Sequence, residues 1–377
     1  MSPDSPLLAF IREEIRASGP ITFHRFLELC LYHPDLGYYN TERTKLGASG
    51  DFYTSAHVAP VFARVLARHF ERLWRKLDCP SRFDLVELGP GDGQFANELL
   101  AWIEPCFPDF FSCLRYVAIE QSAHLRNRIQ ESLAHFGSRI TILPSLPIPP
   151  DADGFQGCIF ANEFFDALPV HILLWRDGCW RERRVGWEAG LEGEKLVWVE
   201  SGLVAPDLAE QAERRFHVAL PQADREYGWV AEISPLATGW MARIGQCLAR
   251  GQALIVDYGY TLEEWRQGRF PEGSALAYRG HQVCYDLLAH AGDQDLTAHA
   301  NFTQLIEAGE RAGLRLASFQ SQAQFLLELG RENEFADVFT DCSSDLERLR
   351  RSQLLKTLIL PQGMGEAFRV LVMDQTS

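Results

Sequence analysis

Metal-ligand patterns are missing from this sequence of 377 residues. Its nine cysteines stand singly, without a Cys-x-x-Cys pair, and no histidine cluster has the spacing of zinc ligands. We therefore expect no metal centre. An odd number of isolated cysteines is typical of free thiols in a reducing compartment, and we expect them to be small buried hydrophobic side chains.

The sequence also lacks a long apolar run, a targeting segment and a positive net charge. No stretch approaches the roughly 20 consecutive apolar residues of a membrane span. The first residues contain no arginine-rich amphipathic run of the transit-peptide type, so we expect a cytoplasmic, bacterial protein. The net charge of −15 repels a phosphate backbone and argues against DNA as a partner. It would favour a cationic ligand or a basic protein segment.

Apolar spacing predicts alternating helices and strands over most of the chain. Spacings of three and four predict these helices: 7–15, 22–31, 60–77, 94–103, 123–135 and 236–249. Short apolar runs predict these strands: 83–88, 115–120, 139–143, 157–161, 253–257, 314–319 and 368–373. Such alternation is typical of a parallel sheet with helices on both faces. The strand 368–373 leaves no room for another helix after it, so we expect the strands 314–319 and 368–373 to pair antiparallel at one edge of the sheet.

Four tryptophans and two turn signals, Asp177-Gly178 and Glu192-Gly193, predict an inserted β-meander over 171–229. We expect its tryptophans to form a small core of their own. The chain then divides into a helical segment with a covering loop (1–80), an α/β domain (81–170 and 230–377) and the insertion (171–229).

A glycine turn follows the strand 83–88 and precedes a helix, so its free backbone N–H groups can bind an anionic or polar cofactor. The dinucleotide fingerprint requires a small residue at the sixth position from Gly89, where Gln94 stands. Glu87, Gly89, Gly91 and Gly93 instead form Glu-x-Gly-x-Gly-x-Gly, which looks like motif I of class I methyltransferases.

Glu120 stands at the end of the next strand, where a carboxylate can accept both hydroxyls of an adenosine ribose. The alternative is a favourable charge near the start of the helix 123–135. Motif I favours ribose binding.

Six ordered motifs over nearly the whole chain resemble the MidA-type family of methyltransferases, which includes a mitochondrial assembly factor of respiratory complex I. Their sequences are Leu31-Tyr32-His33-Pro34 with Gly37-Tyr38-Tyr39, Gly50-Asp51-Phe52-Tyr53-Thr54-Ser55, Glu87 to Gly93, Ala161-Asn162-Glu163-Phe164-Phe165-Asp166-Ala167-Leu168-Pro169, Asp257-Tyr258-Gly259-Tyr260, and Asp295-Leu296-Thr297-Ala298-His299. The sequence departs from the family at Ala56, His57 and Asp92, which puts the substrate in doubt more than the cofactor.

The resemblance implies a class I methyltransferase (Rossmann-like) fold with S-adenosylmethionine as cofactor and S-adenosylhomocysteine as product. It implies symmetric dimethylation of arginine on a protein substrate, for which a complex I subunit and a homodimer are the partners to consider. The expected cofactor-binding residues are Gly50, Asp51, Phe52, Thr54, Ser55, Glu87, Gly89, Gly91, Gly93, Glu120 and Asn162.

The expected catalytic residues are Glu163, Asp166, Asp257 and His299. Glu163 and Asp166 follow the strand 157–161 and Asp257 ends the strand 253–257, which places all three at the carboxyl edge, where open α/β sheets bind ligands; Glu163 is the first choice. Helix capping is the alternative for Asn162 and Asp166, a turn for Asp257 and a structural histidine for His299. The competing functions are a non-catalytic S-adenosylmethionine-binding assembly factor or chaperone and, third, an NAD-dependent oxidoreductase.

Overall fold

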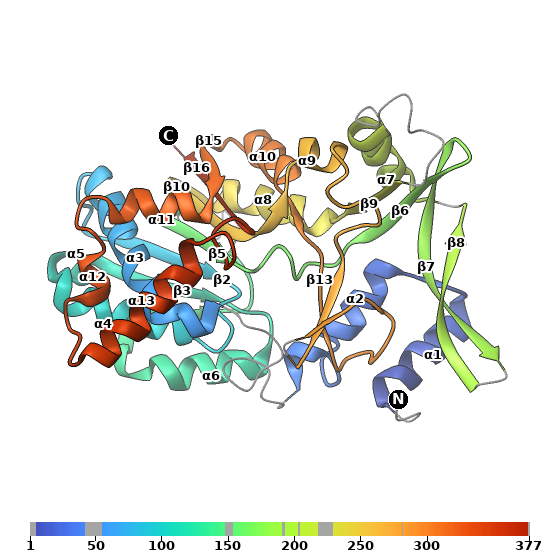
Figure 1. The fold of residues 1–377 in the computed structure, drawn as a ribbon, viewed down its shortest axis with the longest axis horizontal. Coiled ribbons are helices and arrows are strands. Elements are labelled where there is room, and N and C mark those ends of the chain that lie inside the picture. Colours follow the sequence, from blue (N-terminus) through green and yellow to red (C-terminus); the bar gives the residue numbers. More distant parts are fainter. Residues whose placement is uncertain are drawn as a thin grey trace. The chain divides into compact units, whose positions relative to one another are not determined.

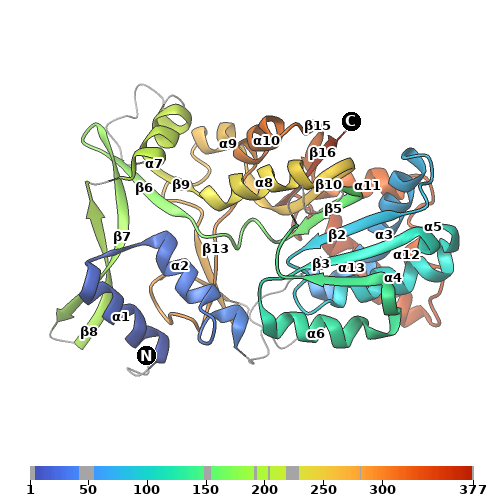
Figure 2. The same cartoon turned by 180° about the vertical axis from the view of Figure 1, so that it is seen from behind.

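The computed structural model describes residues 5–41, 55–147, 154–190, 193–202, 204–217, 229–280 and 282–375. These residues form two compact units (Figures 1 and 2). The sheet unit consists of residues 44–165, 239–259 and 304–377. The second unit consists of residues 1–43, 166–238 and 260–303.

The sheet unit is built on seven strands in the order β15-β16-β10-β5-β2-β3-β4. Their bounds are β2 Phe83–Leu88, β3 Leu114–Ile119, β4 Ile140–Leu143, β5 Phe155–Asn162, β10 Leu248–Tyr260, β15 Arg315–Ser321 and β16 Phe368–Gln375. β2, β3, β4, β5 and β10 run parallel, whereas β16 is antiparallel to both β10 and β15. This confirms the predicted α/β class with an antiparallel edge.

Helices connect these strands, as the alternation predicts. Their bounds are α3 Ser55–Lys76, α4 Gln94–Cys106, α5 Pro108–Cys113, α6 Ala123–Leu133 with the 3-10 turn Ala134–Arg139, α11 Gln322–Gly330, α12 Ala336–Phe339 and α13 Asp345–Ile359. α8 (Pro235–Cys247) and α10 (Phe302–Arg311) each contain residues of both units. α3, α4 and α13 lie over one face of the sheet (Figure 1).

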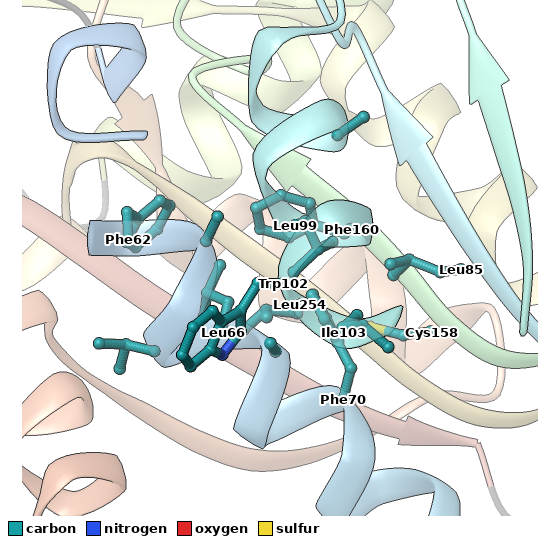
Figure 3. Close-up of a cluster of buried hydrophobic side chains, with 14 of the residues drawn as sticks. Phe62, Leu66, Phe70, Leu85, Leu99, Trp102, Ile103, Cys158, Phe160 and Leu254 are labelled. Atoms are coloured by element: carbon teal, nitrogen blue, oxygen red, sulfur yellow. The ribbon is translucent and has the colours of Figure 1, made fainter. Parts of the chain in front are cut away.

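The core of the sheet unit lies between this helical layer and the strands. α3 contributes Phe62, Leu66 and Phe70, which pack with side chains of α4 and of the sheet in one buried cluster (Figure 3). The strands are apolar on this face and β2 is buried along its whole length, as expected for a sheet that helices cover.

The second unit contains the predicted β-meander, with strands β1 and β9 added to it. The order is β1-β7-β6-β9, with β8 paired to β7, and the bounds are β1 Ile21–Thr22, β6 His171–Arg176, β7 Cys179–Gly190, β8 Gly193–Ser201 and β9 Trp229–Ile233. The turn between β6 and β7 uses Asp177 and Gly178, both at positive φ, as predicted.

Two helices and a small sheet complete this unit. They are α1 Pro6–Ser18, α2 Phe23–Tyr32, and β11 Leu276–Arg279 paired with β12 Gln282–Cys284 and β13 Asp295–Thr297. Shorter elements are the 3-10 turn Tyr38–Asn40, α7 Pro206–Gln211, the π-turn Ala212–His217, α9 Leu262–Arg266 and β14 Ala300–Asn301.

The packing contacts between residues divide the chain differently from the three segments predicted from the sequence. α1 and α2 share a hydrophobic cluster with β6 and β7, and Leu296 of β13 belongs to the same cluster. The insertion therefore shares its core with both ends of its unit. The expectation that the four tryptophans form a core of their own holds only for Trp175 and Trp180, which are buried together and pack with Trp265 from outside the insertion. Trp187 packs against the other cluster, and Trp198 is exposed.

The cysteines differ in part from the expectation. All nine are free, and Cys30, Cys158 and Cys247 are buried as expected. Cys79, Cys106 and Cys179, by contrast, are exposed. Cys106 is the last residue of α4, Cys79 lies in the loop after α3, and Cys179 opens β7 after the turn.

Candidate functional site

The carboxyl ends of β2, β3 and β5 lie side by side at one edge of the sheet. The register pairs Leu88 of β2 with both Ile119 of β3 and Ala161 of β5. Strand order reverses here, because the chain moves from β2 outward to β3 and β4 and then returns to β5 on the other side of β2. Open α/β sheets bind ligands at such a switch point. Seven predicted residues lie at or close to the carboxyl ends of β2, β3, β5 and β10: Gly89, Gly91, Gly93, Glu120, Asn162, Glu163 and Asp257.

The glycine turn has the backbone conformation that its sequence predicts. Gly89, Gly91 and Gly93 have φ values of 64°, 59° and 81°, a region that side chains other than glycine rarely adopt. The Gly89 N–H donates to the carbonyl of Ile119 at 2.9 Å, which ties the turn to β3. Gly93 is the N-cap of α4, so the first N–H groups of this helix follow the turn. Backbone donors and missing side chains together fit a cofactor that approaches the chain closely.

Glu120 lies directly after β3, nine-tenths buried. Its Oε1 accepts a hydrogen bond from the backbone N–H of Ser122 at 2.6 Å, and Ser122 is the N-cap of α6. Burial raises the pKa of Glu120 to about 7, while the Ser122 N–H and Arg126 lower it. The carboxyl group therefore stands at the strand end that a ribose-binding acid requires, and it also holds the turn into α6.

Glu87 forms a buried pair with another side chain, which the residue spacing alone does not predict. The Tyr116 hydroxyl donates to its Oε2, and burial raises the pKa of Glu87 to about 7 against the lowering effect of that hydrogen bond. Tyr116 lies 29 residues along the chain, so only the pairing of β2 with β3 brings the two together. A direct role of Glu87 in cofactor binding stays a prediction.

Asn162 ends β5 and Glu163 follows it in a left-handed conformation with φ 49°. The Glu163 N–H donates to the carbonyl of Val256 at 3.0 Å, and the Asn162 amide donates to the Glu163 carboxylate at 3.4 Å. Residues 163–170 form turns and bends without a helix, so the helix-capping alternative for Asn162 and Asp166 does not apply. Glu163 is thus held at the switch point by the neighbouring strand.

Asp257 is fully buried in β10 and organises the segment after β5. Its Oδ2 accepts hydrogen bonds from the N–H groups of Phe164 and Phe165, at 3.2 and 2.8 Å. Its Oδ1 accepts one from Tyr258 N–H at 2.8 Å. These three bonds indicate a positioning role, and the catalytic role stays a prediction.

Asp166 and His299 both belong to the second unit. The Asp166 carbonyl accepts a hydrogen bond from Ala298 N–H at 2.9 Å, and Asp166 is one of the charges that raise the pKa of Tyr39. His299 donates its backbone N–H to Ser274 Oγ at 3.0 Å, and burial, followed by the charge of Arg269, lowers the pKa of its ring to about 4. The ring is therefore neutral at physiological pH.

Five predicted cofactor residues come from the sequence segment 50–55. Gly50, Asp51, Phe52 and Thr54 lie outside the described residues, and Ser55 opens α3 with a side chain that also lies outside them. Two aromatic residues that the prediction did not select lie at the site instead. Phe164 packs against Gly89, and its ring also contacts that of Trp240. The motif around Asn162 contained Phe164 but gave no sign of this contact.

Neither a membrane-spanning helix nor a metal-binding group appears in the described part of the chain. None of its helices is both long and apolar enough to cross a membrane. No three or more His, Cys, Asp or Glu residues there are placed to hold a metal ion.

Comparisons with known proteins identify the cofactor of this site. A Burkholderia thailandensis protein crystallised with bound S-adenosyl-homocysteine is 28% identical and superposes with a TM-score of 0.83, over 100% of this chain and 94% of that chain. Proteins named "Protein arginine methyltransferase NDUFAF7, mitochondrial" are also similar. The Danio rerio protein is 28% identical over 98% of this chain and 86% of its own, and the Homo sapiens protein is 26% identical over 97% and 83%.

The sequence profile of one family matches residues 65–320, which include the glycine turn, Glu120 and the segment after β5. That family is described as "putative S-adenosyl-L-methionine-dependent methyltransferase". S-adenosylmethionine is the cofactor, and the positive φ values of the turn and the carboxyl group of Glu120 fit it. This excludes the NAD-dependent alternative. The chain belongs to this family of S-adenosylmethionine-dependent methyltransferases.

Proposed function

We propose that this methyltransferase acts on an arginine side chain of a protein and that it dimethylates the guanidinium group symmetrically. The relatives named as protein arginine methyltransferases support the acceptor, at 26–28% identity over most of both chains. The net charge of −15 supports a basic protein segment as substrate. A respiratory complex I subunit, the partner that the family resemblance implies, is the first protein to test.

The charge of the acceptor sets the main requirement of the reaction. A guanidinium stays protonated at neutral pH, and two unit cations about 4 Å apart repel each other by about 4 kcal/mol at an effective dielectric constant of 20. S-adenosylmethionine supplies an electrophilic methyl group on a positively charged sulfur. A carboxylate beside the acceptor must therefore offset the repulsion and receive the proton that the nitrogen loses when its bond to carbon forms.

Glu163 carries this proposal. It stands at the strand end beside the glycine turn, and the hydrogen bond from its N–H to Val256 fixes its backbone. A non-glycine residue at φ 49° costs about 1–2 kcal/mol, and such strain gathers at functional sites. We assign to Glu163 the tasks of pairing with the guanidinium and orienting one of its nitrogens. Orientation of reacting groups supplies a large part of enzymatic rate.

Glu163→Gln tests this role. The variant removes the charge and keeps the shape, so we expect it to bind S-adenosylhomocysteine with wild-type affinity and to lose methyl transfer. Glu104→Gln is the matched control, because Glu104 is exposed near the far end of α4, about 15 Å along the helix from the glycine turn. Unchanged turnover in Glu163→Gln would remove Glu163 from the mechanism.

The acceptor is found by incubating a bacterial lysate with labelled S-adenosylmethionine and mapping the modified residue by mass spectrometry. Symmetric dimethylarginine supports the proposal, whereas label on lysine, RNA or a small metabolite contradicts it. If S-adenosylhomocysteine binds and no acceptor is labelled, the chain is a non-catalytic assembly factor or chaperone. Cell fractionation and the solution mass test two further parts of the proposal, the cytoplasmic location and the homodimer.

A further inference from the structure

The Phe164 ring packs directly against the first glycine of the cofactor turn. A Cβ atom built on Gly89 would lie 2.9 Å from Cδ2 of Phe164, closer than such atoms approach in real proteins. Gly89 and Phe164 follow neighbouring strands, β2 and β5, on the two sides of the switch point. The ring therefore occupies the side of Gly89 on which a side chain would otherwise lie, and it stands directly beside the turn that we expect to bind the cofactor.

The backbone that carries Phe164 is fixed on both sides. Asp257 accepts hydrogen bonds from the N–H groups of Phe164 and Phe165, and Val256 accepts the one from Glu163. All three bonds come from the end of β10, which lies next to β5 in the sheet. These bonds fix the backbone from which the Phe164 side chain extends, at the strand end beside Gly89.

Trp240 supports the ring from another direction. The two rings form an edge-to-face pair with centroids 5.0 Å apart and an interplanar angle of 88°. The Arg243 guanidinium lies 5.5 Å from the Trp240 ring centre on the same helix, α8. Phe164 is only partly buried despite these contacts. Such a packed, pre-oriented ring is a surface that a cation can approach at low entropic cost.

We infer that Phe164 is a specificity-determining residue of the cofactor site, whose ring favours the sulfonium of S-adenosylmethionine over the neutral sulfide of S-adenosylhomocysteine. The inference rests on the cofactor and is independent of the acceptor. Substrate and product differ by one methyl group and one positive charge. The quadrupole of an aromatic ring attracts the positively charged sulfonium. The ring distinguishes the two compounds mainly by this charge and only slightly by their shapes. This preference would help the product to leave after each turnover.

Binding of the two compounds to Phe164→Leu tests the inference. We expect the Kd for S-adenosylmethionine to rise about 3- to 30-fold, the range that a cation–π contact supports, and the Kd for S-adenosylhomocysteine to change less than about twofold. Phe164→Tyr keeps a ring and should keep the wild-type ratio. Isothermal titration calorimetry at one pH measures the six dissociation constants of the wild type and the two variants without turnover. Equal weakening of both compounds, or no change, would overturn the inference.

Fluorinated phenylalanines at position 164 provide a test that does not depend on how the leucine variant folds. Each added fluorine weakens the ring quadrupole and leaves the shape of the side chain nearly unchanged, so the affinity ratio should fall in steps. The same replacements at Phe165 are the matched control, because that neighbouring ring is buried 5.4 Å from Phe164. A ratio that is constant across the series at Phe164, or that falls equally at Phe165, would contradict the assignment.

Discussion

Gly89→Ala tests the close contact between the glycine turn and the Phe164 ring. The substitution has two separate costs. An L-residue at φ 64° costs about 1–2 kcal/mol relative to glycine. The new Cβ would also lie 2.9 Å from the Phe164 ring, and overpacking of this kind costs about 1–3 kcal/mol. We expect the free energy of unfolding of the sheet unit to fall by about 2–5 kcal/mol.

Gly93→Ala is the control that separates the two costs. Its φ of 81° is equally unfavourable for alanine, but a Cβ there would lie 3.6 Å from the nearest atom, the Cα of Ile129, which is ordinary contact. We therefore expect Gly93→Ala to cost only the backbone term of about 1–2 kcal/mol. Thermal unfolding without cofactor measures both variants, at about 2–4 °C for each kcal/mol.

The double variant Gly89→Ala/Phe164→Ala isolates the contact between the two residues. Removing the ring relieves the clash, so the double variant should be more stable than the sum of the single variants predicts, by about 1–3 kcal/mol. If Gly89→Ala costs no more than Gly93→Ala, or if the two substitutions are additive, Phe164 does not pack on Gly89. The Phe164 ring would then not lie against the glycine turn, and it could not select between the two forms of the cofactor from there.

Three further predictions concern titratable groups at the site. Because the pKa of Glu120 is about 7 and ribose hydroxyls favour its ionised form, affinity for S-adenosylhomocysteine should rise up to about tenfold from pH 6 to pH 8. Calorimetry on Glu120→Gln should show a flat profile, apart from any slope due to Glu87, whose pKa is also about 7. Asp257→Asn should lower the free energy of unfolding by about 1–3 kcal/mol and weaken S-adenosylhomocysteine binding with it, because an amide cannot accept all three N–H groups. Loss of methyl transfer with stability and affinity intact would instead make Asp257 catalytic. The pKa of His299 is lowered from 6.5 to about 4, so the folded state binds fewer protons and stability should fall as pH drops from 6.5 to 4. His299→Asn should remove that part of the acid sensitivity in thermal unfolding, and an identical pH profile would refute the prediction.

The fold was predictable where local patterns are strong. β2 has the predicted bounds, and the antiparallel pairing of β16 follows from the absence of room for another helix. α13 was not predicted, because only Leu355 and Leu358 on it are fully buried and its apolar period is faint. β11 and β12 are four and three residues long, too short for an alternating pattern to be seen.

The candidate site was predictable only in its local part. Gly89, Gly91, Gly93 and Glu120 were selected because a strand, a turn and a helix follow one another within a short stretch. Contacts between residues that lie far apart in the sequence could not be predicted. Asp257 accepts from N–H groups that lie 92 and 93 residues before it, and such pairs depend on strand order and register, which composition does not contain.

Glu163 combines a strained backbone conformation with the side chain to which we assign a role in methyl transfer. Glycine at this position would adopt φ 49° without steric cost, yet the chain carries a glutamate there. The cost is offset locally, because Val256 and Asp257 together accept three successive backbone N–H groups from residues 163 to 165. Such hydrogen bonds contribute about 0.5–1.5 kcal/mol each, and about 1.5–3 when the acceptor is charged, which exceeds the strain. β10 thus stabilises a carboxylate and an aromatic ring side by side at the end of β5. Asp177 in the β6–β7 turn also has a positive φ, so the conformation supports the proposed direct role of Glu163 in methyl transfer only in combination with its place at the switch point.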